Sequence, residues 1–161
     1  MKLYLVQHAD ALSKADNPER PLSEKGVADA VRMAAFLDVA GVRVDEVVHS
    51  GKKRAQETAN ILANAIWPGH STLEMEGLSP NDSTDHLYHG AQAAGGDICV
   101  VGHLPFMERI AARLLTGTED GLQVGFTPAT IVCLQRDDTG TAGPSGWHLV
   151  WMQTPDILSS S

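Results

Sequence analysis

Several features that mark whole classes of protein are missing from this sequence. Two cysteines among 161 residues are too few for a disulfide-rich scaffold, and we expect Cys99 and Cys133, each within an apolar run, to be reduced core residues. No segment approaches the roughly 20 apolar residues that a membrane-spanning helix requires. The apolar run at residues 3–6 is too short for a signal peptide. We therefore expect a cytoplasmic protein without a membrane partner, whose N-terminus belongs to the fold.

Positive charge is scarce as well. The chain has 12 Lys and Arg residues against 20 Asp and Glu residues, a formal net charge of −8, and apart from Lys52-Lys53-Arg54 its basic residues form no run or stripe. We expect no nucleic-acid partner, because nucleic-acid-binding proteins present basic surfaces. An anionic ligand would need a local positive site in this acidic molecule, so the arginines and the helix N-termini are the candidates for such a site.

What is present is typical of an α/β protein. No repeat, linker or low-complexity segment interrupts the chain, so we predict a single domain over residues 1–161 with a loose tail at 155–161. Short apolar runs predict strands at 3–6, 45–49, 72–75, 97–101, 130–134 and 148–152, the last two joined by a hairpin at 137–146. Helical spacing of apolar residues predicts helices after 23, 52, 83 and 104, which end near 40, 65, 93 and 116.

Capping residues support these helices, with Ser23 as the first N-cap, Asp82 or Ser83 as the third, and Pro105 in the first turn of the fourth. Strands that alternate with helices predict an α/β fold, a three-layer α/β/α sandwich around a mostly parallel central sheet.

Polar motifs follow three of the expected strands at the points where these strands end. In parallel sheets ligands bind beyond the carboxyl ends of the strands, so these motifs should meet at one edge. The motifs are Gln-His-Ala-Asp at 7–10, Ser-Gly-Lys-Lys-Arg-Ala-Gln-Glu-Thr at 50–58 and Gly-His-Leu-Pro at 102–105. We expect His8, Arg54 and His103 to lie together there.

This combination suits a phosphoryl group. A neutral imidazole is a competent nucleophile toward phosphorus, and a second imidazole, if protonated, stabilises charge on the phosphoryl oxygens. Arg54 can hold phosphate oxygens in a bidentate fork, and two helix N-termini add backbone N–H donors. A lone histidine at a strand end is more often structural, but the three motifs together favour a site.

Four motifs in this order resemble those of the histidine phosphatases, also called phosphoglycerate-mutase-like, and in particular their short bacterial SixA-like phosphohistidine phosphatases. They are Leu-Val-Gln-His-Ala at 5–9, Arg-Pro-Leu-Ser at 20–23, Ser-(x)3-Arg-Ala-(x)2-Thr at 50–58 and Val-Gly-His-Leu-Pro at 101–105. The resemblance implies that His8 is the residue phosphorylated, that Arg54 and His103 complete the phosphate pocket, and that Arg20 lies close by. It also implies hydrolysis without metal or cofactor, with inorganic phosphate as product.

The sequence departs from the family motif Arg-His-Gly at two positions, Gln7 and Ala9. Gln7 removes a positive charge and a bidentate donor, although its amide can still donate to substrate as a neutral group. Our hypothesis is that Arg20 replaces the lost charge. The alternative is a regulatory domain that binds phosphoryl groups without turnover.

A general acid is hard to assign. Glu74, Glu76 and Asp82 lie in the stretch where larger family members carry one, but none is in a convincing motif, and solvated loop carboxylates are the simpler interpretation. Imidazole is a better leaving group than an alkoxide, so a weak acid position favours phosphohistidine of a partner protein as substrate. A small phosphate ester is the alternative substrate.

The remaining histidines do not indicate a metal site. His86 and His89 are spaced i and i+3 on an expected helix, but no third ligand accompanies them. His49, His70 and His148 are interpreted as surface or strand residues.

Overall fold

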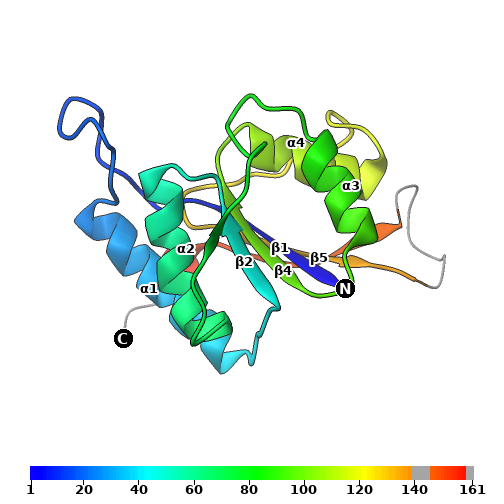
Figure 1. Ribbon diagram of the computed structural model, residues 1–161, viewed down its shortest axis with the longest axis horizontal. Helices are drawn as coiled ribbons and strands as arrows, with labels where there is room; N and C mark the ends of the chain where they lie inside the picture. The colour runs from blue at the N-terminus through cyan, green and yellow to red at the C-terminus, as the bar shows by residue number, and fades with distance from the viewer. Residues whose placement is uncertain (139–145, 159–161) are drawn as a thin grey trace.

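A single six-stranded sheet organises the part of the chain that the computed structural model describes, residues 1–138 and 146–158 (Figure 1). The strand order is β3-β2-β4-β1-β5-β6. The strands are β1 (Lys2–Gln7), β2 (Glu46–His49), β3 (Leu73–Glu74), β4 (Ile98–Gly102), β5 (Ile131–Arg136) and β6 (Trp147–Gln153). The first four are mutually parallel, and β5 and β6 are antiparallel to their neighbours, so the mostly parallel sheet that we predicted is confirmed.

Helices cover both faces of the sheet. Figure 1 shows α1 (Glu24–Val39) and α2 (Lys53–Ile66) on one side, with α3 (Asp85–Ala93) and α4 (Phe106–Thr116) on the other. Alternate side chains of β1 point to the two layers: Tyr4 and Val6 pack with α1 and α2, whereas Leu3 and Leu5 pack with α3 and α4. The α/β/α sandwich is therefore confirmed. Cys99 and Cys133 are buried free thiols in these cores.

The predicted helix ends agree with the structure for the beginning of α1 and the end of α4, and differ from it for the beginning of α3. The Ser23 hydroxyl accepts from the Gly26 N–H at 3.0 Å, and Gly117 ends α4 with φ 89°. The N-cap of α3 is Thr84, which makes no side-chain capping bond, so the prediction of Asp82 or Ser83 at that position is wrong. The Ser83 hydroxyl nevertheless accepts from the N–H of Asp85, the first residue of α3, at 3.2 Å. Asp82 instead accepts from the Ser79 N–H and closes the preceding turn.

The end of the chain is more ordered than we predicted. Residues Pro155–Ile157 form the 3-10 helix η1, Pro155 is buried, and Leu158 packs on the core beneath α1 and α2. The prediction of a loose tail is therefore wrong for 155–158. Its last residues, 159–161, and positions 139–145 of the expected hairpin lie outside the described residues. Among the helices of the described chain, none combines the length and apolar character needed to cross a membrane.

Candidate functional site

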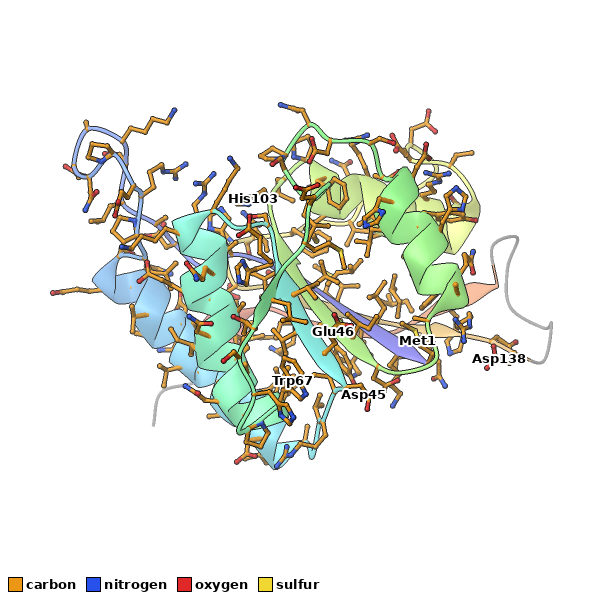
Figure 2. The ribbon with its side chains drawn as sticks, in the orientation of Figure 1. Met1, Asp45, Glu46, Trp67, His103 and Asp138 are labelled. Carbon is orange, nitrogen blue, oxygen red and sulfur yellow. The ribbon has the colours of Figure 1, made fainter. Side chains whose placement is uncertain are left out.

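The carboxyl ends of β1, β2 and β4 meet at one edge of the sheet, because these strands are parallel and pair in register. The backbone N–H of His8 donates to the Gly102 carbonyl at 3.0 Å, which joins the residue after β1 to the last residue of β4. The rings of His8 and His103 lie with their centroids 5.1 Å apart. Figure 2 shows His103 near the beginning of α2, the helix that carries Arg54. The structure thus brings together the three residues that the motifs singled out.

One hydrogen bond fixes the tautomer of His8. Its Nδ1 lies 2.7 Å from the carbonyl oxygen of Ala9, and because a carbonyl can only accept, Nδ1 carries the proton and Nε2 keeps its lone pair. Burial lowers the pKa of His8 to about 4 against the effect of this hydrogen bond, and the charges of Arg54 and Arg20 lower it further. The imidazole is therefore neutral near pH 7, the form that acts as a nucleophile.

Thr58 holds the backbone that orients His8. Its buried hydroxyl accepts from the Ala9 N–H at 3.0 Å and donates to the Arg54 carbonyl at 2.8 Å. These two bonds connect the turn after β1 to the first turn of α2. They keep the Ala9 carbonyl in place, and with it the His8 ring.

His103 is almost wholly buried and is held by Ser50. Its Nε2 lies 2.6 Å from the Ser50 hydroxyl. Burial lowers the pKa of His103 to about 3, and the neighbouring His8, Arg54, Lys52 and Arg20 lower it further. The ring is neutral near pH 7, so the protonated form considered from the sequence requires a nearby anion to raise its pKa. As a neutral ring it can still donate one hydrogen bond.

Positive charge gathers here without carboxylate partners. Within the described chain, neither Arg54 nor Arg20 forms an ion pair, and the Arg20 Nε donates only to the Leu12 carbonyl at 2.9 Å. The pKa of Arg54 is lowered first by burial and then by the charge of Arg20, so the two guanidinium groups repel each other. Two unpaired like charges in a molecule of net charge −8 indicate a site for an anion.

Unsatisfied buried polar atoms mark the same place. Across the described residues, the buried side-chain nitrogens and oxygens without a hydrogen-bond partner are Gln7 Oε1, Arg54 Nε and His103 Nδ1. Buried polar groups are nearly always hydrogen-bonded, and all three exceptions belong to one sheet edge. The Gln7 amide can present its NH2 group there by rotation about its last side-chain bond. This edge of the sheet therefore holds buried polar groups whose hydrogen-bonding capacity is unused.

The three candidate acids do not contact this group. Glu76 is exposed in a turn, and the carboxylate of Asp82 accepts from the Ser79 N–H at 2.8 Å. Glu74 lies over the turn between β2 and α2, where a Cβ on Gly51 would come within 2.3 Å of its Oε1. No hydrogen bond or ion pair among the described residues joins these carboxylates to His8, Arg54 or His103.

The other histidines lie elsewhere. His86 and His89 are exposed on α3, and the described residues contain no cluster of three or more His, Cys, Asp or Glu that could hold a metal ion. His49 is the buried last residue of β2, where its Nδ1 accepts from the Gly51 N–H at 3.0 Å. His70 stacks on Trp67, and His148 is an exposed residue of β6.

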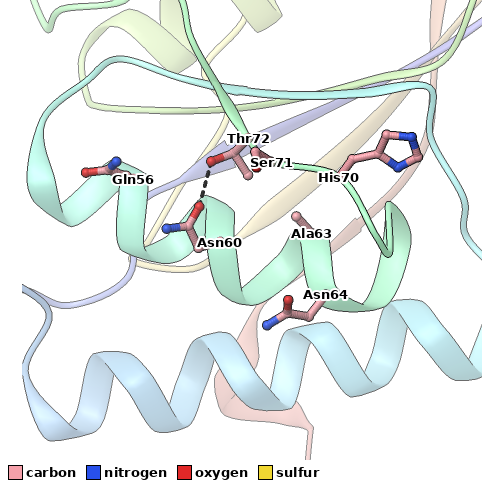
Figure 3. A pocket seen from close by; sticks show the side chains of 7 residues that line it. All are labelled: Gln56, Asn60, Ala63, Asn64, His70, Ser71 and Thr72. Atoms are coloured by element: carbon pink, nitrogen blue, oxygen red, sulfur yellow. Dashed lines mark hydrogen bonds between the residues drawn. The ribbon is translucent and has the colours of Figure 1, made fainter.

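A pocket of about 380 Å³ runs along the outer side of α2 (Figure 3). Across it the Thr72 hydroxyl donates to Asn60 Oδ1 at 2.6 Å. Its lining residues carry amides, hydroxyls and one imidazole but no carboxylate, lysine or arginine: Gln56, Asn60, Ala63, Asn64, His70, Ser71 and Thr72. The pocket therefore lacks the cations that gather at the sheet edge.

Two positioning residues, Ser50 and Thr58, were part of a sequence motif but received no role from it. Thr58 follows Arg54 by four residues, so the two lie on one face of α2, and that spacing was the available signal. Ser50 follows β2 directly, as His8 follows β1. Lys52, whose charge reaches His103, was also not singled out.

Known proteins resemble this chain in sequence and in structure. Residues 3–78 match the sequence model of the histidine phosphatase superfamily (branch 1). The chain is 30% identical over 142 residues to an uncharacterised protein of Picosynechococcus sp., across 84% of this chain and 85% of that protein. It is 25% identical over 154 residues to the phosphohistidine phosphatase SixA of Escherichia coli (strain K12), across 92% of this chain and 93% of that protein. A solved structure of the protein histidine phosphatase SixA complexed with tungstate covers 99% of this chain and 100% of its own, with TM-score 0.83 and 23% identity.

Proposed function

This chain belongs to the histidine phosphatase superfamily, and from that premise we propose that it is a metal-independent phosphatase with His8 as its nucleophile and protein phosphohistidine as its substrate. The observation that carries the proposal is the state of His8. Its Nδ1 is bonded to the Ala9 carbonyl and its pKa is lowered to about 4, so its Nε2 has a free lone pair at neutral pH. Unpaired arginines lie beside it, which is the arrangement that attack on an anionic phosphoryl group requires.

The reaction has two steps. His8 Nε2 attacks phosphorus, a new N–P bond forms, the bond from phosphorus to the substrate imidazole breaks, and the departing nitrogen takes up a proton from solvent. Water then attacks the phosphorus on His8, inorganic phosphate leaves, and the imidazole returns to its neutral form. Arg54, His103 and Arg20 contribute by binding the phosphoryl oxygens, whose charge must be stabilised throughout the transfer.

Two observations support phosphohistidine as the substrate class. Imidazole departs from phosphorus more readily than an alkoxide, which needs a general acid. Among the described residues, no carboxylate forms a hydrogen bond with His8 or His103, and the Asp10 carboxylate, whose charge reaches His8, accepts from the Ser23 hydroxyl at 2.6 Å, so no free acid is evident for an ester. In addition, the E. coli protein to which the chain is 25% identical is a phosphohistidine phosphatase.

The test is a comparison of two substrates in the presence of a chelator. We expect hydrolysis of a phosphohistidine-containing protein with kcat/KM well above that for p-nitrophenyl phosphate, and no dependence on added zinc or manganese. Turnover of small phosphate esters alone would make the chain a phosphomonoesterase. Binding of vanadate without turnover of either substrate would favour a regulatory domain.

A further inference from the structure

Two consecutive lysines stand at the beginning of α2, Lys52 as its N-cap and Lys53 as its first residue, and their surroundings differ. Lys53 is exposed and pairs with Glu19, with 3.1 Å between Nζ and the carboxylate oxygen. Lys52 is the N-cap residue of α2 and is partly buried. No ion pair within residues 1–138 or 146–158 involves its ammonium group. The stem of a partly buried lysine can be covered while its ammonium group stays in water, and because no carboxylate of the described residues pairs with that group, it is available to an anionic ligand.

Lys52 is built into the turn that carries two members of the site. Two residues earlier, Ser50 lies 2.6 Å from His103 Nε2, and the Lys52 backbone N–H approaches the same hydroxyl at 3.4 Å. Two residues later comes Arg54. The charge of Lys52 lowers the pKa of His103, so its field reaches the ring.

The site can use a further positive charge. Position 7 is a neutral glutamine, and the cations that act on His103 are Arg54, Lys52 and Arg20. A phosphoryl group in transfer spreads its negative charge over three oxygens. Each of the three oxygens can accept a hydrogen bond from a cation, so the group offers Lys52 an oxygen to bind beside those that Arg54 and Arg20 bind.

Resting on the proposed function, we propose that Lys52 binds a phosphoryl oxygen on the His103 side of the site and supplies the positive charge that Gln7 does not. The role is specific to Lys52, because its neighbour Lys53 is already paired at the surface. The backbone of the Ser50–Arg54 turn positions it.

The experiment compares Lys52→Gln, Lys52→Arg and the control Lys53→Gln by calorimetric affinity for orthovanadate and by kcat/KM. We expect Lys52→Gln to weaken vanadate binding and to lower kcat/KM by about 10- to 100-fold, since a charged hydrogen bond is lost. Lys52→Arg should restore most of both. Lys53→Gln should stay within about threefold of wild type, as expected for a surface ion pair.

Vanadate affinity separates this inference from the proposed function, because the measurement needs no turnover. If the wild-type protein binds vanadate but hydrolyses neither substrate, the proposed reaction is wrong. The vanadate affinities of the Lys52 and Lys53 variants would still decide whether Lys52 binds the anion. Unchanged affinity in Lys52→Gln, or an equal loss in Lys53→Gln, would overturn the role given to Lys52.

Discussion

Thr58→Val removes a hydroxyl that the structure uses to orient the nucleophile. Valine keeps nearly the same shape, so the packing of α2 against the sheet is little disturbed. The change deletes the acceptor of the Ala9 N–H and the donor to the Arg54 carbonyl, at 3.0 and 2.8 Å. We expect the Ala9 carbonyl to shift as a result, and the His8 ring that it holds through Nδ1 to shift with it.

The loss of stability expected for Thr58→Val can be worked out from the burial of the residues involved. Thr58 and Ala9 are both 0% exposed, so no water replaces the lost acceptor, and an unsatisfied buried N–H costs about 1–3 kcal/mol. For a chain of this size each kcal/mol lowers Tm by about 2–4 °C. The rate should fall further than stability alone explains, by about 10- to 100-fold in kcat, because misplacement of a nucleophile by a fraction of an ångström is costly.

The assay is thermal unfolding together with steady-state kinetics. Thr58→Ser returns the hydroxyl and should recover most of kcat. The matched control is Thr116→Val on α4, whose hydroxyl also donates to a carbonyl four residues earlier at 2.8 Å but lies at the end of α4 far from the His103 turn. A Thr58→Val protein with wild-type kcat, or a Thr116→Val protein with the same loss of kcat, would refute the reasoning.

Three further predictions concern the ligand pocket itself. Arg54→Ala and His103→Ala should each lower kcat/KM by about 10²–10³, the loss typical of one preorganised donor, and effects under threefold at both would mean that the site is misassigned. If Arg20 also carries charge that Gln7 lacks, Arg20→Ala should be severely impaired and Gln7→Arg should partly rescue it; additive effects in a double-mutant cycle would contradict this coupling. Burial lowers the pKa of His8 from 6.5 to about 4, so as pH falls the unfolded chain binds a proton at this residue before the folded chain does, and the unfolding free energy should decline between pH 6.5 and 4, less steeply in His8→Ala. The value of kcat/KM should fall only as pH drops through about 4. A loss of rate centred near pH 6.5 would show that the pKa of His8 is not lowered.

The sheet edge could be predicted from sequence because topology alone determines it. Alternating strands and helices specify a parallel sheet, and a parallel sheet brings the ends of its strands together. His8 and His103 follow strands that pair directly, so their proximity required no knowledge of side-chain packing. Arg54 could be placed beside these histidines because it lies in the first turn of α2, the helix that follows β2.

Contacts that depend on side-chain direction could not be predicted in this way. The bond from Ser50 to His103 spans 53 residues and that from Ala9 to Thr58 spans 49, and neither leaves a local pattern. The difference between Lys52 and Lys53 is likewise invisible in the sequence, because it depends on the position of Glu19 in a distant loop.

The N-cap of α3 and the fold of the last residues were predicted wrongly, because contacts that the sequence pattern does not show decide both. Asp82 and Ser83 have strong capping propensity, but Asp82 is engaged in the turn that begins at Ser79 and the helix starts later, after Thr84. Pro155 lies in a polar stretch that reads as a tail, yet it is buried, and its carbonyl accepts from Arg32 on α1 at 3.5 Å. A competing local turn decided the first case, and a tertiary contact decided the second.

The most direct test of the account is the detection of phosphate on His8. Wild-type protein should be mixed briefly with a phosphohistidine-containing substrate, quenched at alkaline pH, at which phosphohistidine survives, and analysed by peptide mass spectrometry. We predict an acid-labile phosphoryl group on the peptide that contains His8, and its loss together with all turnover in a folded His8→Ala variant. Wild-type rates in His8→Ala, or a phosphoryl group trapped at another residue, would contradict the central claim.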